Sequence, residues 1–375
     1  MRKILVFHYG EVAAYPPVLS LVQNLLHNNN EVELISFDGN KLNERILNNP
    51  YFKHSEINFF DKSMLYRHLF LYNNVRKMVE ARMKDKDILW TTTDYSVRVL
   101  GDIVLKYKHV MQLMELVYKF PKYQHLKNIS FPLDKYARAA WKVVVPEENR
   151  AYIQKAWWHL EKVPDILPNK PYTLSYSKEP DVSNSKIKKY FNEKRKIIFY
   201  LGYIGPDRNL DAFAEAVREL DDKEYCLYIL GKVANGWEKN FKEFLDKYPF
   251  VEYLGYVSSP NHLAFLRNAY IGILPYYVND DHPYLPSLNA LYCAPNKLYE
   301  YSGYAVPMVG TNVLGLKVPF DFYKIGMCCK DLSVNSVADT IKKVDENHDL
   351  FSENCKTFFN NTDLDGILEN ILNEN

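Results

Sequence analysis

The feature that most constrains the fold is a regular alternation of short apolar runs with longer amphipathic segments. In the first half, residues 17–28 have apolar side chains at helical spacing, and Pro16 and Pro17 suit the first turn of that helix. The predicted strands of this half are 3–8, 31–37, 87–91, 109–115 and 142–146. Alternation of strands and helices is typical of a mainly parallel sheet with helices on both faces.

The same alternation restarts after residue 195 and is clearer there. The predicted strands are 197–201, 225–230, 251–254, 270–275 and 306–310, and the predicted helices are 209–220, 237–247, 260–268 and 295–302. The first three strands end at Gly202, Gly231 and Gly255. A glycine at this position lets the backbone approach a ligand at the carboxyl edge of a parallel sheet.

The segment between the halves is rich in Pro, Ser and Lys and lacks long periodicity, which indicates a linker. A chain of 375 residues suffices for two hydrophobic cores. The predicted divisions are a first domain at 1–165, a linker at 166–195, a second domain at 196–355 and a final segment at 356–375. The final segment includes a short amphipathic helix at 364–373.

Composition limits the partners and the compartment. A net charge of +1 does not favour a nucleic-acid partner. The 5 cysteines have no C-x-x-C spacing, which indicates free thiols in a reducing compartment rather than disulfides or a zinc site. The apolar run at the N-terminus is too short for a signal peptide, and no uncharged stretch of about 20 apolar residues occurs. We therefore expect a cytoplasmic protein.

One basic segment leaves a membrane contact open. Residues 62–86 predict an amphipathic helix that carries many Lys and Arg residues among apolar ones. Such a helix either rests on an anionic membrane at its inner face or is an ordinary domain helix with a solvated side.

The segment most informative about chemistry is 294–303, APNKLYEYSG. Pro295 suits the first turn of a helix, and Lys297 and Glu300 share one helix face. A helix N-terminus presents free N–H groups to an anion, to which Lys297 adds a full charge, and Glu300 would accept hydrogen bonds from two adjacent ribose hydroxyls. An ordinary surface ion pair on a capped helix is the alternative.

Three blocks of the second half, 201–217, 251–276 and 294–312, resemble recurring blocks of the GT-B glycosyltransferases, especially glycosyltransferase family 4 and relatives that build bacterial polysaccharides. Segments 8–26, 114–121 and 143–153 are similar to the acceptor-side domain of that family. The resemblance covers nearly the whole chain and is strongest at 197–312. It implies an α/β GT-B architecture, with two Rossmann-like domains facing across a cleft. It also implies that the last helix crosses back to the first domain.

The resemblance also implies roles for single residues. It places Glu300 on the ribose, Lys297 and Arg208 on the diphosphate, and Gly202 close to the phosphates, while Tyr256 and its neighbours line the base pocket. The expected donor-binding residues are Gly202, Tyr203, Arg208, Tyr256, Asn296, Lys297 and Glu300.

Two departures from the family pattern leave the stereochemistry open. Tyr292 stands where many retaining members have the first carboxylate of a Glu-x7-Glu pair, and Tyr203 stands where many have a basic residue. An inverting enzyme needs a base near the acceptor hydroxyl. The candidates that follow strands of the first half are His8, Glu11, Asp94 and Glu115. Glu115 is the first choice, a structural role for it remains the alternative, and in a retaining enzyme it would only position the acceptor.

The predicted function is transfer of a sugar from a nucleotide donor, most simply a UDP-sugar, to a hydroxyl of a glycan or of a lipid-linked oligosaccharide. No cofactor and no metal are expected, because the nucleotide-sugar is a substrate and the adjacent pair Asp280–Asp281 lacks Asp-x-Asp spacing. A sugar-nucleotide epimerase of GT-B shape and a non-catalytic nucleotide- or glycan-binding subunit are the alternatives. An NAD enzyme is disfavoured, since no G-x-G-x-x-G follows either opening strand.

Overall fold

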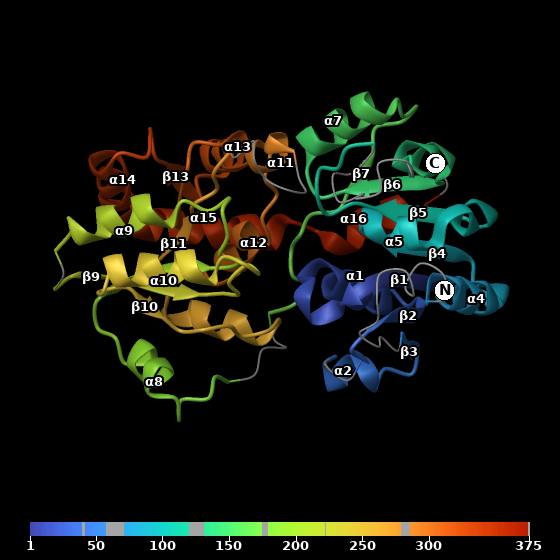
Figure 1. The fold of residues 1–375 in the computed structure, drawn as a ribbon, viewed down its shortest axis with the longest axis horizontal. Helices are drawn as coiled ribbons and strands as arrows, with labels where there is room; N and C mark the ends of the chain where they lie inside the picture. Colours follow the sequence, from blue (N-terminus) through green and yellow to red (C-terminus); the bar gives the residue numbers. More distant parts are fainter. Residues whose placement is uncertain are drawn as a thin grey trace. The chain divides into compact units, whose positions relative to one another are not determined.

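The computed structural model describes residues 1–39, 42–57, 71–119, 131–174, 179–221, 223–278 and 286–373. The chain forms two compact units, each with its own parallel sheet (Figure 1). The first unit consists mainly of Met1–Thr173 and Asp363–Asn375, and the second mainly of Leu174–His282 and Ser287–Thr362.

The first unit contains a seven-stranded sheet in the order β3-β2-β1-β4-β5-β6-β7, and every neighbouring pair is parallel. Its strands are β1 (Lys3–Glu11), β2 (Glu31–Phe37), β3 (Phe52–Glu56), β4 (Ile88–Thr92), β5 (His109–Gln112), β6 (Lys142–Val145) and β7 (Asp165–Ile166). Strand order reverses direction between β1 and β4, and ligands of doubly wound sheets bind at the carboxyl edge beside such a reversal.

Helices cover both faces of this sheet. They are α1 (Pro16–His27), α2 (Glu44–Leu47), α4 (Tyr72–Arg82), α5 (Asp94–Leu100), α6 (Leu133–Ala139) and α7 (Glu148–Trp158), with 3-10 segments η1 (Val12–Ala14), η4 (Met83–Asp85) and η5 (Gly101–Lys106). Of the predicted helix 62–86, the part after residue 70 is α4 and η4, and residues 58–70 lie outside the described residues.

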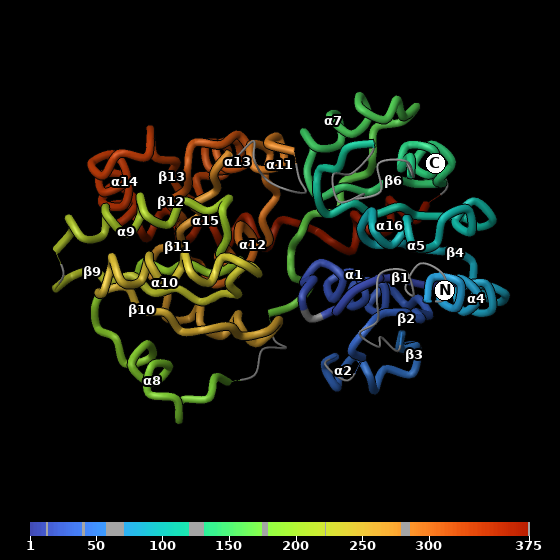
Figure 2. Tube along the Cα trace, viewed as in Figure 1, coloured from blue at the N-terminus to red at the C-terminus, as the bar shows by residue number. Residues whose placement is uncertain are grey.

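The end of the chain belongs to the first unit. Helix α16 (Leu364–Leu372) packs on α1 through buried apolar residues that include Leu364 and Leu368. Asn24 of α1 donates its side-chain N–H to the Leu364 carbonyl at 2.9 Å, and Asn28 donates to the Asp365 carboxylate at 2.8 Å. In Figure 2, helix α16 near the red end of the chain lies among the blue and green segments of this unit.

The second unit contains a six-stranded parallel sheet in the order β10-β9-β8-β11-β12-β13. Its strands are β8 (Lys196–Leu201), β9 (Tyr225–Leu230), β10 (Glu252–Tyr253), β11 (Ile271–Leu274), β12 (Met308–Gly310) and β13 (Gly326–Cys328). The five predicted strands of this half are confirmed as elements, with ends shifted by up to two residues. β13 was not predicted from the sequence.

The helices of this unit are α8 (Ser185–Phe191), α9 (Leu210–Arg218), α10 (Glu238–Lys247), α11 (Ser287–Leu291), α12 (Asn296–Gly303), α13 (Leu314–Tyr323), α14 (Val334–Glu346) and α15 (His348–Asn361). The helix predicted at 260–268 is present as a 3-10 helix, η6 (Asn261–Asn268). Its buried apolar residues fit either helix type, so the sequence pattern does not separate the two.

The segment predicted as a linker has structure of its own. The units divide between Thr173 and Leu174, and α8 lies within the predicted linker. Tyr190 of α8 is fully buried in the second core and donates its hydroxyl to the Phe265 carbonyl at 2.6 Å. Two turns of helix are too short to show periodicity, which explains why composition alone indicated a linker.

Candidate functional site

The three glycines that end β8, β9 and β10 lie side by side at the carboxyl edge of the second sheet. Gly202 donates its N–H to the Leu230 carbonyl at 3.0 Å, and Gly231 donates to the Gly255 carbonyl at 2.9 Å. A Cβ on Gly231 would lie 1.7 Å from the Gly202 carbonyl oxygen, so the first two backbones touch. This edge therefore presents closely packed backbone of the kind that admits a phosphate.

Helix α12 is fixed against this edge by Tyr301. The Tyr301 hydroxyl donates to the Phe199 carbonyl at 3.0 Å and accepts the Leu201 N–H at 3.0 Å. One turn earlier, Lys297 reaches the glycine loop: a Cβ on Gly202 would lie 3.0 Å from its Cε and 3.5 Å from its Nζ. The structure thus brings the Lys297 ammonium to the loop that follows β8.

Glu300 lies one turn deeper on α12 and is buried, with 1% of its surface exposed. Its Oε1 is 3.4 Å from Nε2 of His262, and its Oε2 is 3.9 Å from Nζ of Lys297. Burial by itself would raise the pKa of Glu300, but the charges of Lys297 and His262 and the His262 hydrogen bond lower it overall. Within the described part of the chain, Oε2 has no hydrogen-bond partner.

Arg208 is the second basic residue at this edge. Its guanidinium lies 4.0 Å from the centre of the Tyr276 ring, pairs with the Asp207 carboxylate and donates to the Asp207 carbonyl at 3.0 Å. Burial would lower the pKa of Arg208, but Tyr276 and Asp207 raise it overall, so the group stays charged. A Cβ on Gly202 would lie 3.3 Å from the hydroxyl of Tyr200, a neighbour of Arg208.

The remaining donor-side predictions fall on the same edge. Tyr203 follows Gly202 and Tyr256 follows Gly255, and about half of each side chain is exposed. Asn296 is the first residue of α12. Tyr292, which stands where the family pattern has a carboxylate, is partly buried just after α11.

In the first unit, the acid–base candidates lie at or just after the carboxyl ends of three neighbouring strands. His8 lies in β1, Asp94 begins α5 after β4, and Glu115 follows β5. Glu115 is half-exposed and lies 3.5 Å from Nη1 of Arg150, while Glu11 ends β1. The three strands are adjacent in the sheet, so these residues share its carboxyl edge.

His8 is a neutral imidazole with a fixed orientation. The Thr92 hydroxyl donates to the Phe7 carbonyl at 3.3 Å, so it accepts the Nδ1–H of His8 at 2.8 Å. Burial lowers the pKa of His8 to about 3, and its Nε2 has no hydrogen-bond partner among the residues that the structure describes. The arrangement leaves a lone pair on Nε2.

Three residues of these edges were not predicted: Tyr15, Tyr200 and His262. The ring of Tyr15 lies 4.6 Å from that of His8. Burial raises the pKa of Tyr15 most, and the charges of Glu115 and Asp94 raise it further, so Tyr15 joins the acid–base candidates into one group. No sequence motif marks these residues, since their proximity arises only when the sheet forms.

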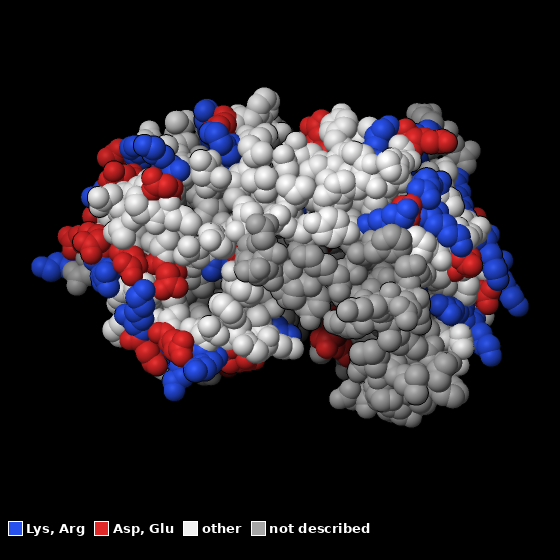
Figure 3. All heavy atoms as spheres, turned by 45° about the horizontal axis from the view of Figure 1, so that its top comes forward, with Lys and Arg blue, Asp and Glu red and all other residues white. Residues whose placement is uncertain are grey.

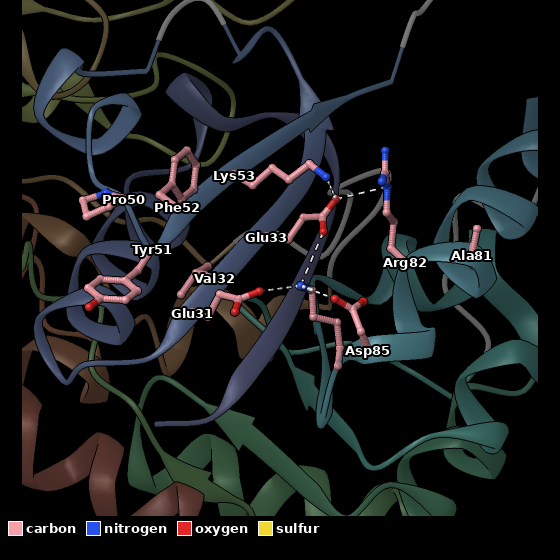
Figure 4. A pocket seen from close by; sticks show the side chains of 11 residues that line it. Glu31, Val32, Glu33, Pro50, Tyr51, Phe52, Lys53, Ala81, Arg82 and Asp85 are labelled. Atoms are coloured by element: carbon pink, nitrogen blue, oxygen red, sulfur yellow. Dashed lines mark hydrogen bonds and ion pairs between the residues drawn. The ribbon is translucent and has the colours of Figure 1, made fainter.

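A pocket of about 440 Å³ lies elsewhere in the first unit (Figure 4). It lies at the amino ends of β2 and β3, where Glu31, Glu33 and Asp85 point toward basic side chains. Buried Glu33 is 3.2 Å from Nε of Arg82 and accepts the Ser55 hydroxyl at 2.7 Å. Because these charges pair with one another and the pocket is at the opposite edge from the candidates, we regard it as a structural ion network.

Other features bear on partners. Across the described residues, no helix is long and apolar enough to cross a bilayer. No three His, Cys, Asp or Glu side chains converge as a metal site in the same residues, and Asp280–Asp281 lie outside them. On the described part of the face in Figure 3, charges of both signs are interspersed.

In the described part of the basic segment 62–86, several basic side chains form hydrogen bonds or ion pairs within the first unit. Arg76 donates to the Val99 carbonyl at 2.8 Å, Arg82 pairs with Glu33, and Lys86 donates to Glu31 at 2.7 Å. Lys77 and Lys84 are exposed, and Arg67 lies outside the described residues.

Comparison with known proteins links this geometry to a family. The family model described as Glycosyl transferases group 1 matches residues 181–362, which contain every donor-side candidate. No curated protein matches the chain in sequence.

Solved structures share the fold at low identity. HepE (Alr3699) of Anabaena, in complex with UDP and glucose, is 11% identical with a TM-score of 0.72, covering 99% of this chain and 98% of that one. WaaG, a glycosyltransferase involved in lipopolysaccharide biosynthesis, is 13% identical with a TM-score of 0.64, covering 98% of each chain. A putative UDP-N-acetylglucosamine 2-epimerase from Listeria monocytogenes is 11% identical with a TM-score of 0.63, covering 97% and 98%.

Both units thus have the parallel α/β sheets of the GT-B fold, as the sequence predicted. Residues 181–362 form a glycosyl transferases group 1 domain, and the chain is a glycosyltransferase.

Proposed function

We propose that the chain transfers a sugar from a UDP-sugar to a hydroxyl group of a glycan or of a lipid-linked oligosaccharide. The observation that carries the donor assignment is the buried Glu300 carboxylate, whose Oε2 lacks a donor within the described part of the chain, beside Lys297 and the Gly202 loop. The two hydroxyls of a ribose can donate hydrogen bonds to such an oxygen. A diphosphate is an anion that the Lys297 ammonium and the free N–H groups at the start of α12 can bind.

The assignment of UDP and of a glycan acceptor draws on the neighbours in fold. The HepE structure contains UDP and glucose, and WaaG takes part in lipopolysaccharide biosynthesis. An epimerase shares the fold as well, so turnover of the donor must be shown to need an acceptor.

The residues of the second unit supply the charge that transfer needs. When the glycosidic bond to the diphosphate breaks, negative charge develops on the departing UDP. In this proposal Lys297 and Arg208 stabilise that charge together with the N–H groups at the start of α12. The proposal includes no metal, so activity should persist in excess EDTA.

The first unit supplies the acceptor side of the proposal. Glu115 and Asp94 are carboxylates at the carboxyl edge of its sheet, and His8 contributes a neutral imidazole. If the reaction inverts the anomeric configuration of the sugar, one of the carboxylates accepts the proton of the attacking hydroxyl. If the reaction retains that configuration, the carboxylates orient the acceptor.

The test is a thermal-shift titration with UDP, GDP, CMP, ADP and dTDP on the wild type, Glu300→Ala and Lys297→Ala. Selective stabilisation by UDP that is lost in both variants supports the donor site. Absence of stabilisation by any nucleotide far above a micromolar dissociation constant counts against it. Mass spectrometry of UDP-sugar incubated with and without a lipid-linked acceptor then separates transfer from epimerisation.

Membrane contact is a separate part of the proposal. The exposed Lys77 and Lys84 of the basic segment are its support among the described residues. Flotation with vesicles containing anionic lipid, compared with neutral vesicles, tests it. Equal recovery with both kinds of vesicle contradicts it.

A further inference from the structure

His262 contacts the candidate ribose-binding carboxylate from a different element. It lies in η6, which follows β10, whereas Glu300 lies in α12. His262 is buried, with 7% of its surface exposed, and its Nε2 is 3.4 Å from Oε1 of Glu300. Two segments that are distant in sequence therefore meet at one carboxylate.

The chemistry of the pair fixes the direction of the hydrogen bond. An ionised carboxylate only accepts, so the imidazole carries its hydrogen on Nε2 and donates it to Oε1. The Nδ1 of His262 is buried and lacks a partner in the described ranges. The His262 imidazole is thus not held by a second hydrogen bond within those ranges, and its hydrogen bond there is to Glu300.

The two carboxylate oxygens differ in their surroundings. Oε1 is held by His262, while Oε2 faces Lys297 at 3.9 Å, beyond hydrogen-bond length. A buried carboxylate oxygen without a donor is costly, and a ligand hydroxyl removes that cost. Oε2 has almost no exposed surface, so a ribose reaches it only when a covering group moves; the partly exposed Lys297 side chain lies 3.9 Å from it.

We infer that His262 is a positioning residue that orients the Glu300 carboxylate for the ribose hydroxyls and so sets the preference for a ribonucleotide over a deoxyribonucleotide donor. The inference rests on the proposed function, because it assigns the ribose to Glu300. His262 itself does not contact the reacting atoms.

The experiment measures binding of UDP and of 2′-deoxy-UDP by calorimetry. A hydroxyl that donates to a charged acceptor is worth about a tenfold preference or more, which we expect for the wild type. The variant His262→Leu removes the donor and His262→Gln keeps an N–H at similar reach. We expect the preference to fall at least several-fold in His262→Leu and to stay within about threefold of wild type in His262→Gln.

A double-variant cycle with Glu300→Gln completes the design. If His262 acts through Glu300, adding His262→Leu to Glu300→Gln changes the preference no further. A purely structural role would lower thermal stability and both affinities equally without changing their ratio. If His262→Leu does not fold, His262→Met, which also lacks a side-chain N–H, takes its place in the cycle, and His262→Gln remains the control that keeps the donor.

The outcomes separate the two proposals. A wild type that prefers UDP over 2′-deoxy-UDP, with an unchanged preference in folded His262→Leu, overturns the role of His262 and leaves the donor site standing. A wild type that binds no UDP, or binds both nucleotides equally, overturns the ribose assignment to Glu300 and this inference with it.

Discussion

At the scale of single residues, the glycine edge of the second sheet depends on how closely two backbones approach. We expect Gly231→Ala to lower the free energy of unfolding by about 3 kcal/mol, because its Cβ would meet the Gly202 carbonyl oxygen at 1.7 Å. Urea unfolding measures the loss. Gly236→Ala is the control: it has φ +80° and nothing within 4 Å of its Cβ, so only the backbone penalty of about 1 kcal/mol applies. Equal losses in the two variants would refute the contact argument.

The carboxylates of the first unit give a second prediction at this scale. If Glu115 is the base of an inverting reaction, Glu115→Gln lowers kcat by about 10²–10⁴-fold and leaves UDP affinity unchanged. The same measurement on Asp94→Asn shows which carboxylate acts. Near-normal kcat in both variants would remove them from proton transfer and favour a retaining reaction.

Part of this site could be predicted from the sequence. The spacing of Lys297 and Glu300 places them on one helix face whatever the surrounding fold, and the strand-ending Gly202 marks the edge beside them. His262 and Tyr15 could not be predicted, because their contacts join segments that are distant in sequence. Buried polar atoms without partners are a property of the packed chain only.

At the scale of elements, strand β4 carries two threonines that fix two buried histidines on its neighbouring strands. Thr92 holds His8 of β1, and Thr91 holds His109 of β5, at 2.8 Å in each case. Burial lowers the pKa of both histidines to about 3. Each remains neutral in the folded chain at pH values where an unfolded histidine, with a pKa of 6.5, gains a proton.

Stability should therefore fall as the solution is acidified. Because the folded pKa lies below the unfolded one, each histidine's contribution is complete above pH 6.5 and is lost as the pH falls toward 3. Between pH 7 and pH 5 this amounts to about 2 kcal/mol per histidine. Urea unfolding at pH 7 and at pH 5 measures the loss of stability between the two values. This loss should be about 2 kcal/mol smaller in His109→Gln than in wild type. An unchanged pH dependence would contradict the assignment.

Element prediction was closest for long buried strands, and the strands that it missed are short or weakly patterned. Strands β8 and β9, with six buried or nearly buried residues each, were predicted closely. The edge strands β7 and β13 have two and three residues, too few for a pattern. β3 was missed for another reason, because its five residues alternate only weakly in burial.

At the scale of the whole molecule, each compact unit buries hydrophobic residues of its own, which implies two unfolding transitions. Leu368 of α16 is fully buried in the first unit, so Leu368→Ala should lower the stability of that unit by about 3 kcal/mol. The exposed Glu369→Ala should have an effect within about 0.5 kcal/mol. Calorimetry should show the transition that UDP stabilises unmoved by Leu368→Ala. A shift of both transitions would show that the units unfold together.

The most direct test of the central claim is calorimetric titration of UDP into wild type, Glu300→Gln and Lys297→Met. Lys239→Met, which removes a highly exposed charge from the same unit, is the matched control. We predict that UDP binds wild type and Lys239→Met with equal affinity, and that it binds the two site variants at least about tenfold more weakly. Equal affinity in all four proteins, or no binding to wild type, would contradict a donor site built on Lys297 and Glu300.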